Sequence, residues 1–221
     1  MKRARDFLLL VALLVSALAI LPGGRTAATG AIFVDNATVG GNTFTTAASF
    51  GDASSIFYTH QVEMSGVSPW GRSMDTTAPT GTNAEYAQIK AGTNVYWYST
   101  TYPTGDGDGG IAAGDYTFTM YVAAWPGSGK SVTIRVHVGL VNPGGSVYEN
   151  ITTSPLRTID SSTTSPMVIS LGSGAAQTFT ASNPKRIRLW IEGVSSVGGG
   201  NFSMAYDGVS EPTNLATPVV W

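Results

Sequence analysis

The sequence is poor in the residues on which most catalytic chemistry depends. Its 221 residues include no cysteine, two histidines and charged side chains at only 12%. The lack of cysteine excludes disulfides, c-type haem attachment and thiolate metal sites. No H-E-x-x-H, G-x-S-x-G or P-loop pattern is present either. Stability must therefore come from an ordinary hydrophobic core, which a chain of this length can build.

A long apolar run occurs once, at the N-terminus. Three basic residues precede an apolar run of 15 residues, 7–21, and a Pro-Gly-Gly sequence follows it. This is the layout of an export signal, and the run is shorter than the roughly 20 residues that span a bilayer. We expect residues 1–30 to be a signal peptide, cleaved near Thr29 or Ala31, or else a retained anchor. The protein is then secreted, extracellular or at the cell surface, with no membrane segment after cleavage.

The net charge of the mature chain indicates which kinds of partner it can bind. Residues 1–30 hold four of the 12 basic and one of the 14 acidic residues, so the mature chain carries a net charge of −5. A negative balance of this kind argues against nucleic acid as a partner.

Helical periodicity is nearly absent, whereas alternation of apolar and polar residues recurs along the chain. In 132–140 the apolar residues fall on one side of the expected strand, and Thr133, Arg135 and His137 fall on the other. The same alternation marks 117–122 and 186–191. Weaker strand candidates are 54–64, 86–89, 94–98, 147–152, 167–171, 177–180 and 202–206.

Roughly ten strands joined by short turns, without helical crossovers, predict antiparallel pairing. We therefore expect an all-β fold, an antiparallel β-sandwich of jelly-roll type, preceded by an N-terminal signal helix. Residues 31–48 would form an N-terminal arm or first strand, and residues 49–221 the sandwich domain. The proline-interrupted tail, 208–221, is expected to return along a sheet edge.

The histidines and carboxylates give little sign of catalysis. His60 and His137 both lie inside expected strands rather than in loops, where reactive side chains are usually presented. The alternation predicts an exposed His137 and a core or edge position for His60. The carboxylates are scattered, and nothing marks the pair that a glycosidase needs. We therefore predict that the protein is not an enzyme, since a hydrolase would require two carboxylates or a His-acid pair to converge in the fold.

One group of aspartates is close enough together in the sequence to supply the ligands of a metal site. Asp106 and Asp108 lie in "GDGDGG", and Asp115 follows closely. Alternating aspartates in a tight loop can gather oxygen ligands around Ca²⁺, although the pattern lacks the glutamate of an EF-hand. Asp-Gly pairs are equally typical of a solvated turn. Calcium at these three residues and a simple turn are both open; no other cofactor is expected.

Aromatic residues are more numerous than one core face can hide. Tyr96, Trp97, Tyr98 and Trp190 are candidates for surface contact with a glycan or another protein. The alternative is that outward rings stabilise the sheet through cross-strand pairs. Candidate glycosylation sites are the sequons at Asn36, Asn150 and Asn201.

The segment behind the apolar run resembles a known junction. Ala31-Ile32-Phe33-Val34-Asp35, followed by Asn42-Thr43-Phe44, is similar to the junction of camelysin/TasA-like secreted proteins, a family of biofilm-matrix fibres. The resemblance covers about 24–47, with Ala47 where glycine is usual. The remainder resembles β-sandwich modules of bacterial and archaeal surface proteins.

The resemblance implies assembly by strand exchange. In such fibres the freed N-terminal segment leaves its own subunit and completes a sheet in the next subunit, and head-to-tail exchange builds a filament. Here the assembly strand would be Ala31, Ile32, Phe33, Val34 and Asp35, unless they form an intramolecular first strand. We thus expect a secreted structural protein of the cell surface or extracellular matrix, with itself as homopolymer or a neighbouring surface protein as partner. The alternative function is a secreted carbohydrate-binding or adhesion module.

Overall fold

The computed structural model describes residues 38–39, 42–43, 54–103 and 108–220. The chain divides into two compact units, 1–51 and 52–221. In the first unit the described part is an antiparallel pair, β1 (Thr38–Val39) and β2 (Asn42–Thr43). The expected signal helix, the assembly strand 31–35 and the sequon at Asn36 lie outside the described residues.

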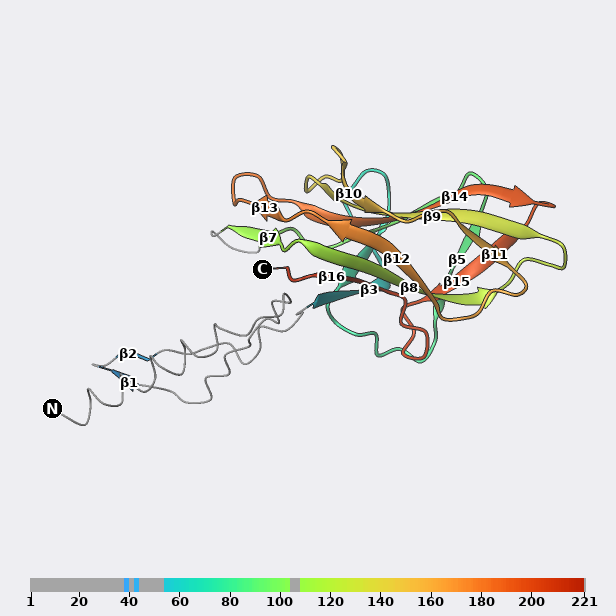
Figure 1. Ribbon diagram of the computed structural model, residues 1–221, viewed down its shortest axis with the longest axis horizontal. Coiled ribbons are helices and arrows are strands. Elements are labelled where there is room, and N and C mark those ends of the chain that lie inside the picture. Colours follow the sequence, from blue (N-terminus) through green and yellow to red (C-terminus); the bar gives the residue numbers. More distant parts are fainter. Residues whose placement is uncertain (1–37, 40–41, 44–53, 104–107, 221) are drawn as a thin grey trace, which may run out of the picture. The chain divides into compact units, whose positions relative to one another are not determined.

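The second unit is built from strands, and the expectation of an all-β fold is confirmed for the part of the chain that the structure describes (Figure 1). None of the described segments is a helix of the length and apolarity needed to cross a membrane. The strands are β3 (Ser54–Glu63), β4 (Arg72–Asp75), β5 (Glu85–Lys90), β6 (Asn94–Tyr98), β7 (Gly109–Ile111), β8 (Gly114–Ala124), β9 (Ser131–Val141), β10 (Glu149–Thr153), β11 (Arg157–Asp160), β12 (Met167–Gly174), β13 (Gln177–Phe179), β14 (Arg186–Val197), β15 (Asn201–Tyr206) and β16 (Asn214–Pro218).

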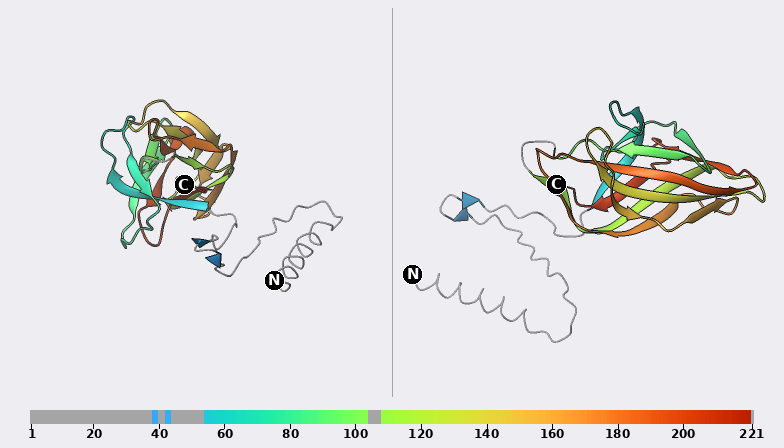
Figure 2. Two further views of the ribbon diagram at one scale, coloured as in Figure 1. Left: turned by 90° about the vertical axis from the view of Figure 1, so that its left-hand side faces the viewer. Right: turned by 90° about the horizontal axis from the view of Figure 1, so that it is seen from above.

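Twelve of these strands form one sheet, in the order β10-β9-β14-β6-β4-β3-β16-β8-β15-β5, with β11 beside β9 and β12 beside β8. Strands β7 and β13 form a separate antiparallel pair. The long strands run side by side along the length of the unit (Figure 2). The sheet is mixed, because β4 pairs with β6 in parallel; the expectation of purely antiparallel pairing is wrong at this point.

The sheet curls, so that β9 and β14 lie opposite β8 and β16 with the core between them (Figure 1). The predicted alternation places the core correctly in the three long strands, where every second residue is buried. On β9 these residues are Val132, Ile134, Val136, Val138 and Leu140. Burial of such side chains is the main favourable term of folding, at roughly 1.5–3 kcal/mol for each large apolar side chain.

The C-terminal tail occupies a central position rather than an edge. Strand β16 pairs with β3 on one side and with β8 on the other, and Leu215 is fully buried. Pro218, which has no N–H to donate, stands at the last position of the strand, opposite Ser54. The prolines therefore bound the strand and do not keep it out of the sheet interior, which corrects the expectation of an edge.

Candidate functional site

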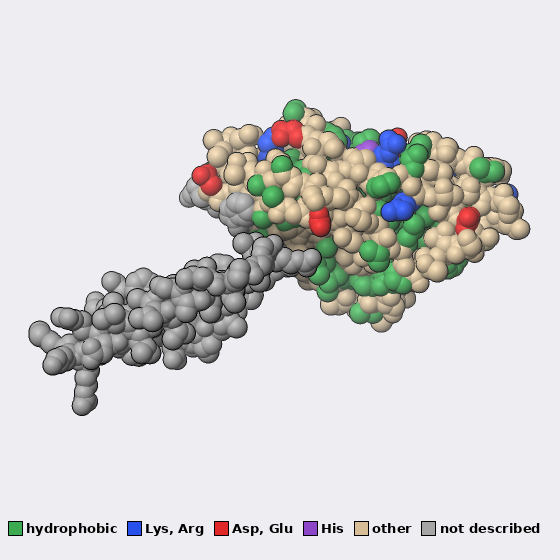
Figure 3. Space-filling view, viewed as in Figure 1, with side chains coloured by type: hydrophobic (Ala, Val, Ile, Leu, Met, Phe, Trp, Pro, Cys, Tyr) green, Lys and Arg blue, Asp and Glu red, His purple; other side chains and the backbone are tan. Residues whose placement is uncertain are grey.

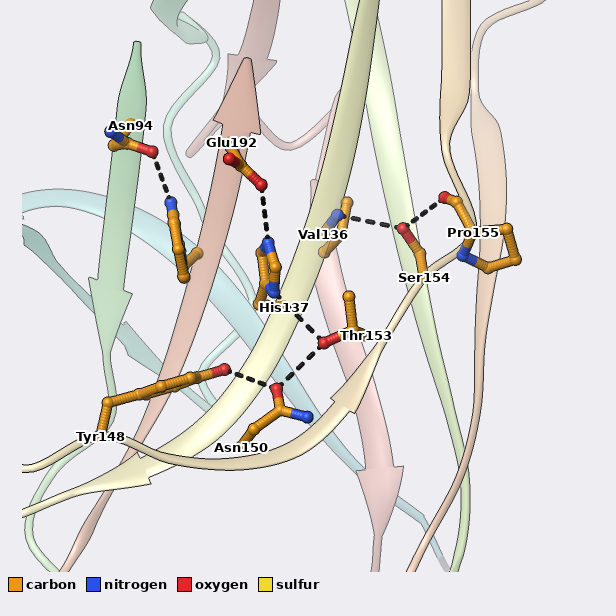
Figure 4. A network of polar contacts seen from close by, with 10 residues as sticks. Asn94, Val136, His137, Tyr148, Asn150, Thr153, Ser154, Pro155 and Glu192 are labelled. Carbon is orange, nitrogen blue, oxygen red and sulfur yellow. Dashed lines mark hydrogen bonds and ion pairs between the residues drawn. The ribbon is translucent and has the colours of Figure 1, made fainter. Parts of the chain in front are cut away.

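Two of the four aromatic residues expected at the surface form a row of rings across the outer side of the sheet. Trp190 on β14 lies opposite Tyr96 on β6 and opposite His137 on β9. Its ring stacks on the His137 imidazole at 4.1 Å and an interplanar angle of 16°, and lies 5.9 Å from the Tyr96 ring. The Trp190 indole N–H donates to Asn94 Oδ1 at 2.8 Å (Figure 4). The row is partly exposed, and it makes the cross-strand pairs that stabilise a sheet.

His137 is buried, contrary to the expectation of an exposed histidine. Its residual exposure is 9%, because Trp190 covers one ring face and polar groups engage both nitrogens. Nδ1 lies 3.2 Å from Thr153 Oγ1 and Nε2 lies 3.1 Å from Glu192 Oε2 (Figure 4). Burial lowers the pKa of His137 and outweighs the opposing effect of Glu192. His137 thus serves as a polar link between β9, β10 and β14.

Trp97 and Tyr98 are not surface residues, which corrects that part of the prediction. Trp97 is fully buried and packs edge-to-face on Tyr206, with ring centroids 5.5 Å apart. Tyr98 has the outward parity of Tyr96, yet it is covered, and its hydroxyl donates to the Pro69 carbonyl at 2.7 Å. Gly71 allows this cover, because a Cβ there would lie 2.6 Å from Tyr98 Cε2.

A second aromatic surface was not expected from the sequence. Tyr86, at the start of β5, is 58% exposed and lies between two open hollows of about 400 and 380 Å³ that both include it in their lining. The first hollow is lined by Thr82, Asn83, Ala84, Tyr86, Gly208, Ser210 and Glu211. The second is lined by Gln61, Val62, Glu63, Arg72, Glu85, Tyr86 and Tyr206.

The second hollow holds charges of both signs that are distant in sequence. Glu63 and Glu85 line it together with Arg72. The Arg72 guanidinium lies 4.8 Å from the centre of the Trp70 ring and 5.5 Å from that of Tyr206. Trp70, which stacks on this guanidinium, is itself 52% exposed.

A histidine–carboxylate cluster joins residues that are sequence neighbours of this lining. His60 Nδ1 lies 2.7 Å from Asp207 Oδ1, and His60 Nε2 lies 3.3 Å from Asp75 Oδ1. The other oxygen of Asp207 accepts the backbone N–H of Gln61 at 2.9 Å. Asp207 has a φ of +59°, a conformation that is uncommon for residues other than glycine and that is often found at functional sites. The cluster links β3 to β4 and to the residue that follows β15.

The sequence contains a weak signal for this surface. In β5 the exposed residues Tyr86, Gln88 and Lys90 alternate with buried Ala87 and Ile89, so an aromatic stands at a polar position. The partners that turn it into a site come from β3, β4 and the segment after β15, and only the fold brings them together.

The structure describes only two of the three aspartates predicted to bind calcium. Asp106 lies outside the described residues, Asp108 is exposed, and Asp115 accepts a hydrogen bond from Ser173. Among the residues that the structure describes, no group of three or more acidic or histidine side chains could hold a metal ion. Calcium at this loop stays a prediction.

Two of the three sequons fall in described strands, at exposed positions. Asn150 Oδ1 accepts hydrogen bonds from the Tyr148 hydroxyl and Thr153 Oγ1, each at 3.0 Å. Asn201 Oδ1 lies 3.4 Å from Gln88 Nε2. Glycan attachment at either residue also stays a prediction.

Comparison with known proteins identifies a fold but no family. No protein-family model and no curated protein matches the sequence. An aminopeptidase from a marine sediment archaeon of the Thaumarchaeota is similar in structure, with a TM-score of 0.50 and 8% identity over 76% of this chain and 37% of that one. A CocE/NonD family hydrolase from Staphylococcus aureus has a TM-score of 0.49 and 11% identity over 80% of this chain and 39% of its own. The chain thus spans less than two fifths of the length of either protein.

The comparison overturns the prediction that the protein is not an enzyme. That prediction took a β-rich chain without a catalytic motif as evidence against catalysis, whereas a fold of this kind is found within an aminopeptidase. At 8% identity the likeness shows the fold alone. The structure also brings His60 and Asp207 together, a His-acid pair of the kind that the sequence does not reveal.

Proposed function

We propose that the protein is a secreted component of the cell surface or extracellular matrix that binds a saccharide at the hollows on either side of Tyr86. The observation that carries this proposal is the position of the ring. It is more than half exposed, at 58%, and two open hollows flank it. An exposed Tyr offers an apolar ring face together with a polar tip.

The lining suits a polar, uncharged ligand. Asn83, Gln61 and Ser210 supply neutral hydrogen-bonding groups, and Arg72 partly balances the carboxylates of Glu63 and Glu85. Ligand sites typically combine ring contacts with a few placed polar groups. Over the whole chain, charged residues make up only 12%, and the face of the molecule drawn in Figure 3 shows few of them. A neutral saccharide, with a C–H face for the ring and hydroxyls for the rim, matches this chemistry.

Substitution of Tyr86 tests the site directly. We expect Tyr86→Ala to weaken saccharide binding about tenfold or more, equivalent to about 1.4 kcal/mol, because the stacking surface is lost. Glycan-array screening would identify the ligand, and calorimetry on wild type and variant would measure its affinity.

The matched control is Trp125→Ala, which removes another exposed ring, at 42% exposure. It should leave the affinity unchanged. A blank glycan array, or equal losses in the two variants, would refute saccharide binding at Tyr86.

The jelly-roll topology of the sandwich and the export of the chain are part of the same proposal. The apposition of β9 and β14 with β8 and β16 across one core supports a sandwich of jelly-roll type. The basic start and the 15-residue apolar run support a signal helix that directs export.

A second candidate function is filament formation by exchange of the N-terminal strand. One observation favours it: within the described residues, the first part of β3, Ser54 to Phe57, pairs with β16 alone. An unpaired strand edge is a template for an added strand, and 31–35 precede this edge in the chain. The added strand would come from a neighbouring copy.

Removal of the arm tests this second candidate. We expect the mature chain to form filaments that electron microscopy detects, and a chain starting at residue 49 to stay monomeric in light scattering because it lacks the donor strand. Strand exchange is wrong if both forms remain monomeric.

A further inference from the structure

Arg188 is a cation enclosed by aromatic rings on the outer side of β14. Only 6% of the residue is exposed. Its guanidinium carbon lies 4.1 Å from the centre of the Tyr148 ring, 5.4 Å from that of Tyr96 and 5.8 Å from that of Trp190. Such cation–π contacts stabilise a guanidinium, but they supply no hydrogen-bond acceptor in the plane of its N–H groups.

No anion of the described chain pairs with Arg188. Its Nε is buried and has no hydrogen-bond partner there. The neighbouring cations are engaged: Arg186 donates to the carbonyls of Pro143 and Ser99, and Lys185 pairs with Glu149. Burial raises the pKa of Tyr98, and the charge of Arg188 and a hydrogen bond from Arg188 oppose that rise. The Tyr98 hydroxyl donates its own hydrogen to the Pro69 carbonyl, so it is a neutral acceptor and supplies no counter-ion for Arg188.

A buried charge without a counter-ion is costly and is usually paired. Here the local structure is built to keep the enclosure around Arg188. Gly139, opposite Arg188 on β9, leaves room for the Tyr148 ring, because a Cβ at Gly139 would lie 2.6 Å from Tyr148 Cζ. Val147 holds a φ of +56° just before Tyr148, and a β-branched residue adopts that conformation only under constraint.

We propose that Arg188 anchors a binding site for a sugar acid, with its guanidinium pairing with the carboxylate of a uronate. Arginine presents a planar fork of donors that matches a carboxylate. Trp190 and Tyr96, both partly exposed beside it, supply ring surface for the C–H face of a pyranose. A single unpaired guanidinium matches a monoanion, and the ring row favours a uronate over the carboxylate of a peptide.

This site is independent of the hollows beside Tyr86, because the two share no residue. It therefore does not rest on the function proposed above. A Tyr86→Ala variant should bind a uronate as wild type does, which separates failure of one proposal from failure of the other.

The test is a titration of the full chain with sodium glucuronate, with glucose and acetyl-diglycine as comparison probes. Calorimetry and the indole N–H signal of Trp190 in NMR spectra report binding. We expect glucuronate to bind at least tenfold more tightly than either probe, and its affinity to fall as salt is added because the pairing is ionic.

Variants assign that binding to the guanidinium. Arg188→Met should weaken glucuronate binding at least tenfold, and Arg188→Lys should weaken it several-fold because the fork is lost. The matched control is Arg157→Met, which removes another arginine whose Nε is buried without a hydrogen-bond partner in the described chain and should leave binding unchanged. If Arg188→Met does not fold, as circular dichroism would show, the comparison of Arg188→Lys with Arg157→Lys decides.

Three results would overturn the proposal: no glucuronate binding at millimolar concentration, equal binding of glucuronate and glucose, or wild-type affinity in the folded Arg188 variant. Binding of acetyl-diglycine as tight as that of glucuronate would replace the sugar acid by a peptide carboxylate, and would equally overturn it.

Discussion

Trp97→Ala is expected to lower the free energy of unfolding by about 3–5 kcal/mol, the range for loss of a large aromatic side chain from a packed core. Trp97 has no exposed surface and belongs to the central hydrophobic cluster. The truncation would remove its contacts, including the edge-to-face packing on Tyr206, and leave a cavity that the surrounding strands can fill only in part. Because folded domains are marginally stable, this loss is a large share of the total.

Urea unfolding followed by circular dichroism measures the effect, with Trp125→Ala as the matched control. Trp125 is 42% exposed and donates its indole N–H to the Thr163 carbonyl at 2.6 Å. Its removal should cost less than half as much. Similar losses for the two tryptophans would contradict the burial of Trp97, and would return it to the surface position that its sequence neighbourhood suggests.

The contrast between Trp97 and its neighbours shows which side-chain environments the sequence can predict. Alternation predicts that Trp97 and Tyr96 face opposite sides of β6, and they do. Alternation does not tell which side is covered when several aromatic residues follow one another, so the sequence predicts both Trp97 and Tyr98 as surface candidates. Tyr98 is covered by residues near Pro69 and Gly71, and such a long-range cover leaves no trace in the local pattern.

The strongest alternation predicts the structure best. The long strands β8, β9 and β14 each turn one apolar face to the core, so their apolar period is clear and their core residues are correctly expected, although parts of β9 and β14 are covered on the other face as well. The short strand β4 has few residues to show a period, and the sequence does not predict it. Yet β4 is the strand that joins β3 to β6, and it carries Arg72 and Asp75 to the second hollow and the His60 cluster.

The candidate sites also depend on contacts between residues that are far apart in sequence. His60 and Asp207 are 147 positions apart in sequence and only 2.7 Å apart in the fold, and Arg188 meets Tyr148 from a neighbouring element. The sequence identifies a carboxylate, a histidine or an arginine, but its environment is set by which strands pair. This is also why the absence of a catalytic motif did not justify the prediction that the protein is not an enzyme.

Gly193→Ala is expected to destabilise the protein by about 3 kcal/mol, the upper end of the usual cost of overpacking. Gly193 lies where the turn between β5 and β6 crosses β14. Its N–H donates to the Thr93 carbonyl at 2.8 Å, and its carbonyl accepts the Gly92 N–H at 2.7 Å. A Cβ at this position would lie 2.8 Å from the carbonyl carbon of Lys90 and would overlap its oxygen. Because the obstacle is backbone, relief requires a shift of the turn and strain in both hydrogen bonds.

Gly127→Ala is the matched control, since it adds the same methyl group in open surroundings. There the nearest atom to an added Cβ is Lys130 Cδ at 3.7 Å, an ordinary contact, so the stability should change by no more than about 0.5 kcal/mol. Chemical denaturation of the two variants separates the close backbone approach at Gly193 from the general effect of replacing glycine. Equal midpoints would mean that the turn at Lys90 yields without cost, and that β5 is held against β14 less tightly than the two hydrogen bonds imply.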